Sequence, residues 1–263
     1  MGNLRIGCAL WRTKRGVRPS FLHIMITTPI DPNVYETQGS VELLEVMPDP
    51  GTNVPLETAI VNAARVSYLG ESKGVEQDKK LLLYLLNHHH TSPFEHVVFK
   101  FRVKAPVVTW WQWVRHRTWS YNFQSGRYTE FNDEEYYSPD TWRMQAKINK
   151  QGSAGFVGPD VNEELCEAYE AHMASSFSLY RHALAEGVAK EQARLFLPAF
   201  GLQYTAICTV DAHNLMQFLR LRMAEDAQLE IRVYARKIYE YFGYFMPFTA
   251  QWMMSQWTAL EKL

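Results

Sequence analysis

The spacing of apolar and polar residues along the chain predicts amphipathic helices and a few short strands. Apolar side chains at helical spacing, with prolines or capping residues at the segment ends, predict helices at residues 56–67, 76–90, 107–115, 160–186, 189–197, 211–223 and 227–245. Short apolar runs predict strands at residues 40–47, 97–103 and 203–210. A Trp- and Met-rich helix is predicted after Pro247, and we interpret it as core or interface.

The helix predicted over residues 160–186 is the longest in the chain. Its apolar stripe advances by steps of three and four from Leu165 to Leu184, and Asp160 is interpreted as its N-terminal cap. At 1.5 Å per residue it measures roughly 40 Å, which is more than one small core covers. We therefore expect part of it to line a subunit interface. The Gly- and Ser-rich residues 149–159 before it are expected to form a mobile loop.

The N-terminal residues and the cysteines indicate the cellular compartment in which the protein is located. Residues 1–30 are basic, and Arg12, Lys14 and Arg15 interrupt the continuous apolar core that a signal peptide needs. We expect them to be a poorly ordered extension or to precede the true start, for which Met25 is a candidate, and residues 31–263 to form one domain. The three cysteines show no metal or redox spacing, and no apolar run reaches the length of a membrane span. These features predict a cytoplasmic protein without a membrane partner.

One basic stretch of the chain has no acidic residues beside it in the sequence. Lys and Arg total 27 against 28 Asp and Glu, so the wide basic face of a general nucleic-acid binder is not expected. Residues 112–128 nevertheless hold Arg115, Arg117 and Arg127, and no acidic residue occurs from 104 to 129. Arginine forks bind phosphate oxygens two at a time, and the aromatic residues between them offer flat faces to a base. The stretch therefore predicts a nucleotide pocket.

Two other interpretations of this stretch remain open from the residues alone. Aromatic side chains among basic ones also occur in RNA-binding modules that stack bases without catalysis. A helical structural protein can also carry an incidental basic turn. The confinement of the charge to one stretch favours an enzyme that acts on a nucleotide. No Gly-x-Gly-x-x-Gly or P-loop sequence is present, which argues against the common dinucleotide and triphosphate sites.

Three consecutive histidines, His88, His89 and His90, end the helix predicted over residues 76–90. Neighbouring side chains on a helix point about 100° apart, so three adjacent imidazoles cannot share one ion. Histidines also suit the C-terminal end of a helix electrostatically. We therefore predict no metal site here, while one of the three imidazoles can still face a ligand.

The spacing of residues 115–128 resembles the signature of the flavin-dependent thymidylate synthases, the ThyX family. Every fixed position of that signature is filled here, by Arg115, His116, Arg117, Ser120, Asn122, Ser125, Arg127 and Tyr128. A pattern with so many fixed positions arises by chance very rarely. The likeness extends to residues 64–67, 91–96, 193–198 and 215–222, and it spans roughly residues 40 to 250.

The resemblance implies an α+β fold, in which a single domain has an antiparallel or mixed sheet flanked by long helices. It implies the conversion of dUMP to dTMP, with methylenetetrahydrofolate as one-carbon donor and FAD, reduced by NADPH, as hydride carrier. Four subunits would form a homotetramer whose active sites are shared between chains. The alternative is a non-catalytic flavin- or nucleotide-binding protein of the same fold.

The resemblance also implies a role for individual residues. Arg222 would be catalytic, because a cation beside the uracil favours its ionised N3 and activates the ring without an enzyme thiol. The dUMP contacts would be Gln112, Arg115, Phe123, Gln124, Ser125, Gly126, Arg127, Arg194 and Arg222, with Arg127 on the phosphate. The FAD contacts would be Ser67, His90, Ser92, Arg115, His116, Arg117, Phe123, Asp211, His213 and Gln217.

Four of these positions depart from what the family often carries. Phe123 stands where Glu or Gln is common, so a polar contact is either lost or supplied by Gln124. Asp211, His213 and Gln217 stand where Asn, Arg and Asn or His are common. Asp211 beside a pyrophosphate would be repulsive. Either it acts only as a helix cap, or FAD binds differently in this protein.

Overall fold

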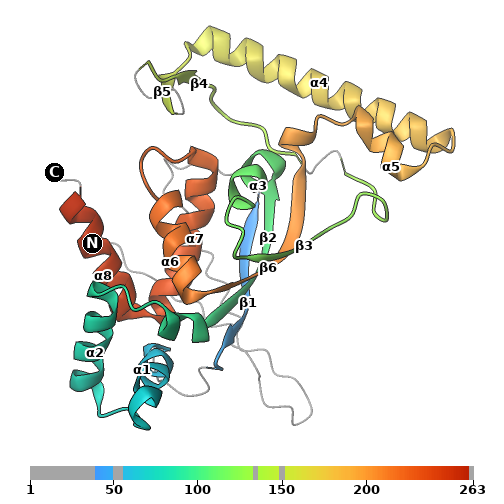
Figure 1. Ribbon diagram of the computed structural model, residues 1–263. Helices are drawn as coiled ribbons and strands as arrows, with labels where there is room; N and C mark the ends of the chain where they lie inside the picture. Colours follow the sequence, from blue (N-terminus) through green and yellow to red (C-terminus); the bar gives the residue numbers. More distant parts are fainter. Residues whose placement is uncertain (1–38, 50–55, 133–135, 148–151, 261–263) are drawn as a thin grey trace, which may run out of the picture.

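A four-stranded antiparallel sheet forms the centre of the protein (Figure 1). The computed structural model describes residues 39–49, 56–132, 136–147 and 152–260, so the extension expected over residues 1–30 lies outside it. The strands lie in the spatial order β1-β2-β6-β3, where they are β1 (Ser40–Met47), β2 (Val98–Pro106), β3 (Ser120–Phe123) and β6 (Gln203–Asp211). Three of them confirm the strands predicted from apolar patterning.

Side-chain alternation explains why β2 lies inside the sheet. Its apolar residues Phe99, Phe101 and Val103 are completely buried, and the basic residues between them point to the opposite face. On that face Lys100 and Arg102 of β2 pair with glutamates of β1 at 3.1 and 2.6 Å. A strand that alternates in this way buries one face and leaves the other face polar.

Helices cover the apolar face of this sheet. In Figure 1, α6 (Ala212–Arg222), α7 (Leu229–Phe245) and α8 (Pro247–Leu260) lie beside it, and α1 (Glu57–Arg65) and α2 (Val75–Asn87) lie below them. The buried face of α7 packs its rings against those of β2, with centroid separations of 6.0 and 6.3 Å. Each large apolar side chain buried in this way contributes about 1.5–3 kcal/mol. This contact fixes the helices that carry the candidate site.

A buried carboxylate attaches α8 to α1. Oε1 of Glu57 accepts a hydrogen bond at 2.9 Å from the backbone N–H of Thr249, in the first turn of α8 and 192 positions later in the chain. Helix starts favour a negative charge because their N–H groups are unpaired. Burial raises the pKa of Glu57, and its bonds to Thr249 and Phe248 act against that shift. Glu57 therefore caps a helix at the far end of the sequence.

The long helix α4 (Pro159–Ala185) extends away from the sheet across the top of Figure 1. Its C-terminal half packs around Met173, Phe177 and Tyr180 in a second apolar cluster, next to the short helix α5 (Lys190–Ala193). In its N-terminal half, Val161 and Leu165 are 48% and 38% exposed, whereas Tyr169 packs against the second cluster.

The start of α4 differs from the prediction. The helix begins at Pro159 with Gly158 as its N-cap, so the predicted cap at Asp160 is wrong. Proline suits the first helical position because its missing N–H has no partner there in any helix. Among the described helices, none combines the length and hydropathy that a bilayer crossing requires.

Two short segments form strands that the sequence did not predict. Residues 120–123, inside the basic stretch, pair with β6 as β3. Part of the loop expected over residues 149–159 forms β5 (Ser153–Phe156), which pairs with β4 (Arg143–Gln145). Both segments are short, and β5 is exposed along its length. Strands that bury little surface leave little apolar pattern in the sequence, which explains why they were missed.

The Trp-rich run forms the helix α3 (Val107–Trp113), which ends two residues earlier than predicted. Trp110 and Trp113 are buried, but Trp111 is 64% exposed and meets the ring of Phe200 at 5.1 Å. The apolar run over residues 107–114, whose composition predicts burial, is therefore buried on one face only. A helix that borders one core presents only one of its faces to it.

Candidate active site

Arg222, the last residue of α6, joins that helix to the end of α3. Its Nε donates to Nε2 of His116 at 2.9 Å, and its two terminal nitrogens donate to the side-chain and backbone oxygens of Gln112 at 3.0 and 3.1 Å. A guanidinium has five N–H donors, so these contacts with described residues use three and leave two for a ligand. The structure thus brings together three residues that the sequence assigns to dUMP or FAD.

The imidazole of His116 is held in its neutral form. Burial lowers the pKa of His116 to about 4, and the charge of Arg222 acts in the same direction. Because Nε2 accepts the bond from Arg222, the ring proton lies on Nδ1. Burial also lowers the pKa of Arg222, and the nearby charge of Arg115 is the second cause. Two arginines this close create a strong local attraction for an anion.

The pKa of His116 leads to a prediction on stability. The unfolded imidazole takes up a proton near pH 6.5, whereas the folded one resists protonation until about pH 4. Stability should therefore fall as the pH decreases from 6.5 to 4, because the unfolded state binds more protons in this window. Thermal melts across it should show a smaller loss for His116→Gln than for the wild type. Parallel losses in the two proteins would contradict this role.

A buried polar network that sequence reasoning missed supports the cluster. Nε2 of Gln112 donates at 3.0 Å to Oε1 of Gln228, which precedes α7. Two residues further on, the buried carboxylate of Glu230 pairs with Arg143 at 2.6 Å and accepts from the Tyr137 hydroxyl at 3.0 Å. Burial raises the pKa of Glu230, but the hydrogen bond and charge of Arg143 lower it overall. The feature of the sequence that could have indicated this network is a glutamate in the first turn of an apolar helix.

The arginines that the sequence assigns to phosphate form a second cluster, beyond the end of β3. Arg127 pairs with Glu191 of α5 at 3.1 Å, and both side chains are more than half exposed. Gly126 is buried, and a Cβ there would lie 2.6 Å from the ring of Phe131 and 3.5 Å from Cδ of Arg194. The glycine is therefore required by packing within the chain, which brings Arg194 beside the loop that carries Arg127.

Other residues of the signature are engaged within the chain. The side-chain oxygen of Gln124 accepts from the backbone N–H of Thr205 at 3.1 Å, so it is already used. Phe123 meets the ring of Trp110 edge to face at 4.7 Å. The hydroxyl of Ser125 accepts from the backbone N–H two residues later at 3.3 Å. Phe123 thus extends an aromatic cluster, which accounts for an apolar residue at this position.

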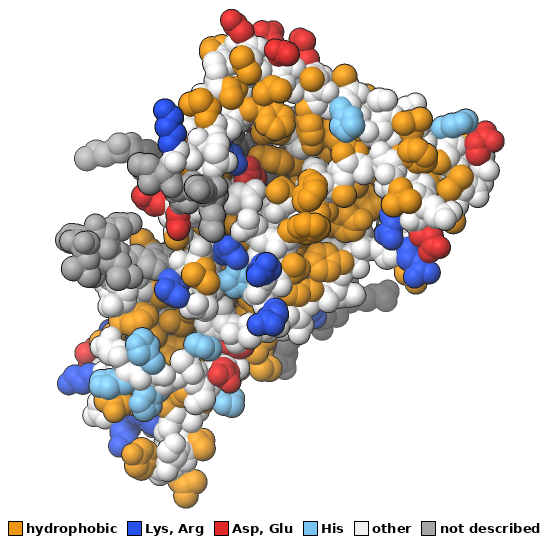
Figure 2. Space-filling view, turned by 45° about the horizontal axis from the view of Figure 1, so that its top comes forward, with side chains coloured by type: hydrophobic (Ala, Val, Ile, Leu, Met, Phe, Trp, Pro, Cys, Tyr) orange, Lys and Arg blue, Asp and Glu red, His pale blue; other side chains and the backbone are white. Residues whose placement is uncertain are grey.

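The two arginine clusters lie apart within one chain. In Figure 1 the helix α6, which ends at Arg222, lies to the left of the sheet, and α5, whose Glu191 pairs with Arg127, lies to its right. Figure 2 shows basic side chains gathered near the middle of one face, between a group of histidines and a broad hydrophobic surface. The basic residues of the signature therefore serve two separate places in the fold.

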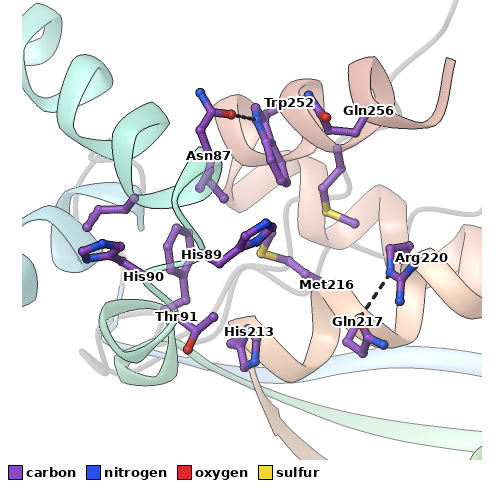
Figure 3. A pocket seen from close by; sticks show the side chains of 14 residues that line it. Asn87, His89, His90, Thr91, His213, Met216, Gln217, Arg220, Trp252 and Gln256 are labelled. Atoms are coloured by element: carbon purple, nitrogen blue, oxygen red, sulfur yellow. Dashed lines mark hydrogen bonds between the residues drawn. The ribbon is translucent and has the colours of Figure 1, made fainter. Parts of the chain in front are cut away.

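A pocket of about 450 Å³ opens between the end of α2, the helix α6 and the helix α8 (Figure 3). His90, His213 and Gln217, three of the residues assigned to FAD, line it. Leucines, methionines and a phenylalanine supply its apolar lining, and none of the described residues that line it is acidic. This combination suits a ligand with a flat ring and a negative charge.

The remaining FAD candidates lie outside this lining. Ser67 is exposed in the turn η1 (Val66–Tyr68), and Ser92 begins the turn η2 (Ser92–His96), directly after the pocket residue Thr91. Arg117 is exposed beyond the end of α3. The structure therefore brings part of the predicted FAD set into one pocket of a single chain.

Asp211 caps α6, as the sequence predicts. Its two carboxylate oxygens accept from the backbone and side-chain nitrogens of Asn214 at 2.9 and 2.6 Å. Asp211→Ala should lower the free energy of unfolding by about 1 kcal/mol, which corresponds to a decrease in Tm of about 2–4 °C. Asp211→Asn keeps a capping oxygen and should melt near the wild type. Equal losses in the two variants would show that the charge, rather than the cap, stabilises the helix.

Comparisons with known proteins identify similar sequences over most of the chain. Residues 43–248 match the family of the thymidylate synthase complementing proteins. The chain is 46% identical to the flavin-dependent thymidylate synthase of Thermus thermophilus over 203 residues, which cover 77% of this chain and 71% of that protein. It is 40% identical to the flavin-dependent thymidylate synthase of Kosmotoga olearia over 212 residues, which cover 81% and 88% of the two chains.

A solved structure shares the fold. The UMP/dUMP methylase PolB from Streptomyces cacaoi, bound with 5-Br UMP, is similar with a TM-score of 0.72 and 30% identity, covering 84% of this chain and 95% of PolB. The predicted α+β fold with an antiparallel sheet is confirmed. Fold and sequence place the protein among the α+β enzymes that methylate nucleotides. The chain belongs to the flavin-dependent thymidylate synthase family and is an enzyme of that family.

Proposed function

We propose that this protein converts dUMP to dTMP and takes the one-carbon unit from methylenetetrahydrofolate. The observation that carries the proposal is the half-buried Arg222, which keeps two N–H donors for a ligand beside the neutral imidazole of His116. Membership of the flavin-dependent thymidylate synthase family supports dUMP as the substrate. The similar solved methylase, which carries 5-Br UMP, supports a uracil nucleotide at such a site.

Arg222 activates the uracil by its charge. A cation near N3 stabilises the anion that forms when N3 loses its proton, and Arg115 adds to the positive potential. The ionised ring is richer in electrons at C5, which makes C5 the nucleophile towards the one-carbon unit. Gln112 bonds to Arg222 through its oxygens and to Gln228 through its side-chain nitrogen. It therefore positions the guanidinium against the base.

The described cysteines support activation without an enzyme thiol. Cys208 is completely buried in β6, and burial raises the pKa of its thiol to about 12. Cys166 lies on α4, with its Sγ 3.8 Å from the carbonyl oxygen of Pro139. A nucleophilic cysteine needs an accessible thiolate, and neither of these two provides one beside Arg222.

The phosphate of dUMP is assigned to Arg127 and Arg194, with the Ser125 hydroxyl in the same turn. The ion pair of Arg127 with Glu191 is exposed, and such pairs contribute little to stability. A phosphate dianion that accepts two parallel bonds from the guanidinium can replace it. Glu191 therefore keeps Arg127 in place without competing strongly with the ligand.

FAD is assigned to the pocket between α2, α6 and α8. When bound and reduced by NADPH, it supplies the hydride for the reaction. The pocket volume of about 450 Å³ lies in the usual range of small-molecule sites. Its apolar lining suits the flavin ring, and Gln217, His213 and Arg220 suit polar and negatively charged groups.

The active sites are proposed to be shared between the subunits of a homotetramer. Two observations support this arrangement. The arginine clusters assigned to the base and to the phosphate of dUMP lie apart within one chain, so a cluster from each of two chains would complete a site. Trp111, Leu195 and Phe200 are more than half exposed, and apolar surface of this kind is typical of a subunit interface.

An NADPH-driven assay of tritium release from dUMP labelled at C5 tests the proposed function. Purified protein should be yellow, release FAD on denaturation, and release tritium only with both NADPH and methylenetetrahydrofolate. Colourless protein that cannot be reconstituted with FAD would contradict the flavin assignment. Bound FAD that NADPH reduces without any tritium release would favour the non-catalytic flavin-binding alternative.

A further inference from the structure

His89 has an unusual backbone conformation at the end of α2. Its φ of 55° lies in the left-handed region, which residues other than glycine seldom adopt. Its N–H bonds to the carbonyl of Leu86 at 3.3 Å, and the N–H of His90 bonds to the carbonyl of Leu85 at 2.9 Å. These two bonds form a Schellman motif, in which glycine usually occupies the left-handed position. A histidine in that position carries a conformational cost that glycine would not.

The three adjacent histidines have different surroundings. Nδ1 of His88 bonds to the carbonyl of Tyr84 at 2.9 Å, and the two rings stack at 4.1 Å. The ring of His90 lies 5.6 Å from the same tyrosine. Figure 3 shows the His89 ring inside the pocket near Met216, while the His90 ring points the other way. Within the described part of the chain, the His89 imidazole makes no hydrogen bond, so both its nitrogens are available to a ligand.

Trp252 lies on the α8 side of the same pocket (Figure 3). Its Nε1 donates to the side-chain oxygen of Asn87 at 2.9 Å, which fixes the indole against the end of α2. The residue is half-buried, and it follows residue 248, where the match to the family ends. A held indole offers a rigid face on which a planar ring can stack.

We propose that His89 and Trp252 are direct contacts of the flavin ring in this pocket. The proposal rests on the assignment of FAD to the pocket. The imidazole supplies a hydrogen bond to a polar edge of the ring, and the indole supplies a stacking face. Strained backbone positions cluster at active sites and ligand-binding sites. The left-handed conformation directs the His89 side chain into the pocket, while its two neighbours lie beside Tyr84.

His89→Gly separates this role from a structural one. Glycine adopts the left-handed conformation without strain, so the Tm of the FAD-free variant should equal or exceed that of the wild type. Its affinity for FAD should fall about fivefold to tenfold through loss of the imidazole contact. FAD affinity is measured by titration of flavin fluorescence. Among the described residues, Leu69 is the other residue besides glycine with a left-handed φ. The change in Tm of Leu69→Gly therefore shows how much stability is gained when such a backbone conformation is relieved alone.

Substitution of Trp252 tests the second contact. Trp252→Leu should weaken FAD binding and reduce the quenching of flavin fluorescence in the bound state, because the stacked indole is lost. Trp252→Phe loses the bond to Asn87 but keeps an aromatic face, so its quenching should lie nearer the wild type. The melting of each variant without FAD shows whether the fold is retained.

The outcomes separate this proposal from the proposed function. The role of His89 is overturned if the wild type binds FAD and His89→Gly binds it equally well or melts at a lower temperature. Either result leaves the proposed function intact. Unchanged quenching in folded Trp252→Leu overturns the role of Trp252. Wild-type protein that does not bind FAD at all overturns the flavin assignment, and this inference with it.

Discussion

Arg222→Ala should lower the turnover number for dTMP formation by about 10²–10³-fold, the usual effect of removing one group that stabilises developing charge. The affinity for dUMP should fall much less, because the proposed role of Arg222 is to stabilise the ionised uracil. Substitution also removes the donor to His116 and both donors to Gln112. Steady-state kinetics and equilibrium dUMP binding, measured on the same preparation, give the two numbers.

Arg222→Lys is the matched control for this experiment. Lysine keeps the positive charge but cannot reproduce the planar fork that bonds to Gln112 and His116 together. Its turnover should therefore lie between those of the wild type and Arg222→Ala. The Tm of each variant shows how much stability is lost with the hydrogen bonds between α3 and α6. Equal losses of turnover and dUMP affinity in Arg222→Ala would contradict the ionisation role.

Arg127→Ala should weaken dUMP binding by about 10–150-fold, which corresponds to the loss of a charge-assisted bond of about 1.5–3 kcal/mol. Its effect on folding should be small, because the pair that it forms with Glu191 is exposed. The measurement is a titration with dUMP and, in parallel, with deoxyuridine, which lacks the phosphate. The deoxyuridine affinity should not change.

Glu191→Gln distinguishes a phosphate contact from a structural pair. This variant releases Arg127 from its carboxylate partner, so dUMP binding should be unchanged or slightly tighter. A loss of affinity equal to that of Arg127→Ala would show that the ion pair shapes the loop and that the phosphate binds elsewhere. The neighbouring pair of Lys190 with Glu130, at 3.1 Å, holds the same loop to α5 in both variants.

The elements that bury one whole face were predictable from the sequence. The strands β2 and β6 and the helices α2 and α7 carry apolar residues at a regular period, because the sheet and the helices on it exclude water from one side. The strand β3 was not predictable. Its four residues gain their order from pairing with β6, which lies more than eighty positions later in the chain.

The candidate site, like the fold, was predictable from the sequence only in part. The signature of spaced arginines located the basic stretch, but it did not show that the stretch supplies two separate clusters. That division depends on Arg222 and Gln228, which reach Gln112 from 110 and 116 positions away. The left-handed backbone conformation of His89 was also not predictable, because composition and spacing do not indicate such a φ at a residue other than glycine.

The position of β6 has a consequence for how the chain folds during synthesis. The strands β2 and β3 come early in the sequence, but β6 pairs with both of them, between residues 203 and 211. Until that segment leaves the ribosome, β2 and β3 have unpaired edges, and exposed edges of this kind invite pairing with other chains. Such distant contacts also slow folding. In nascent chains of this protein the sheet can therefore close only after β6 has been synthesised.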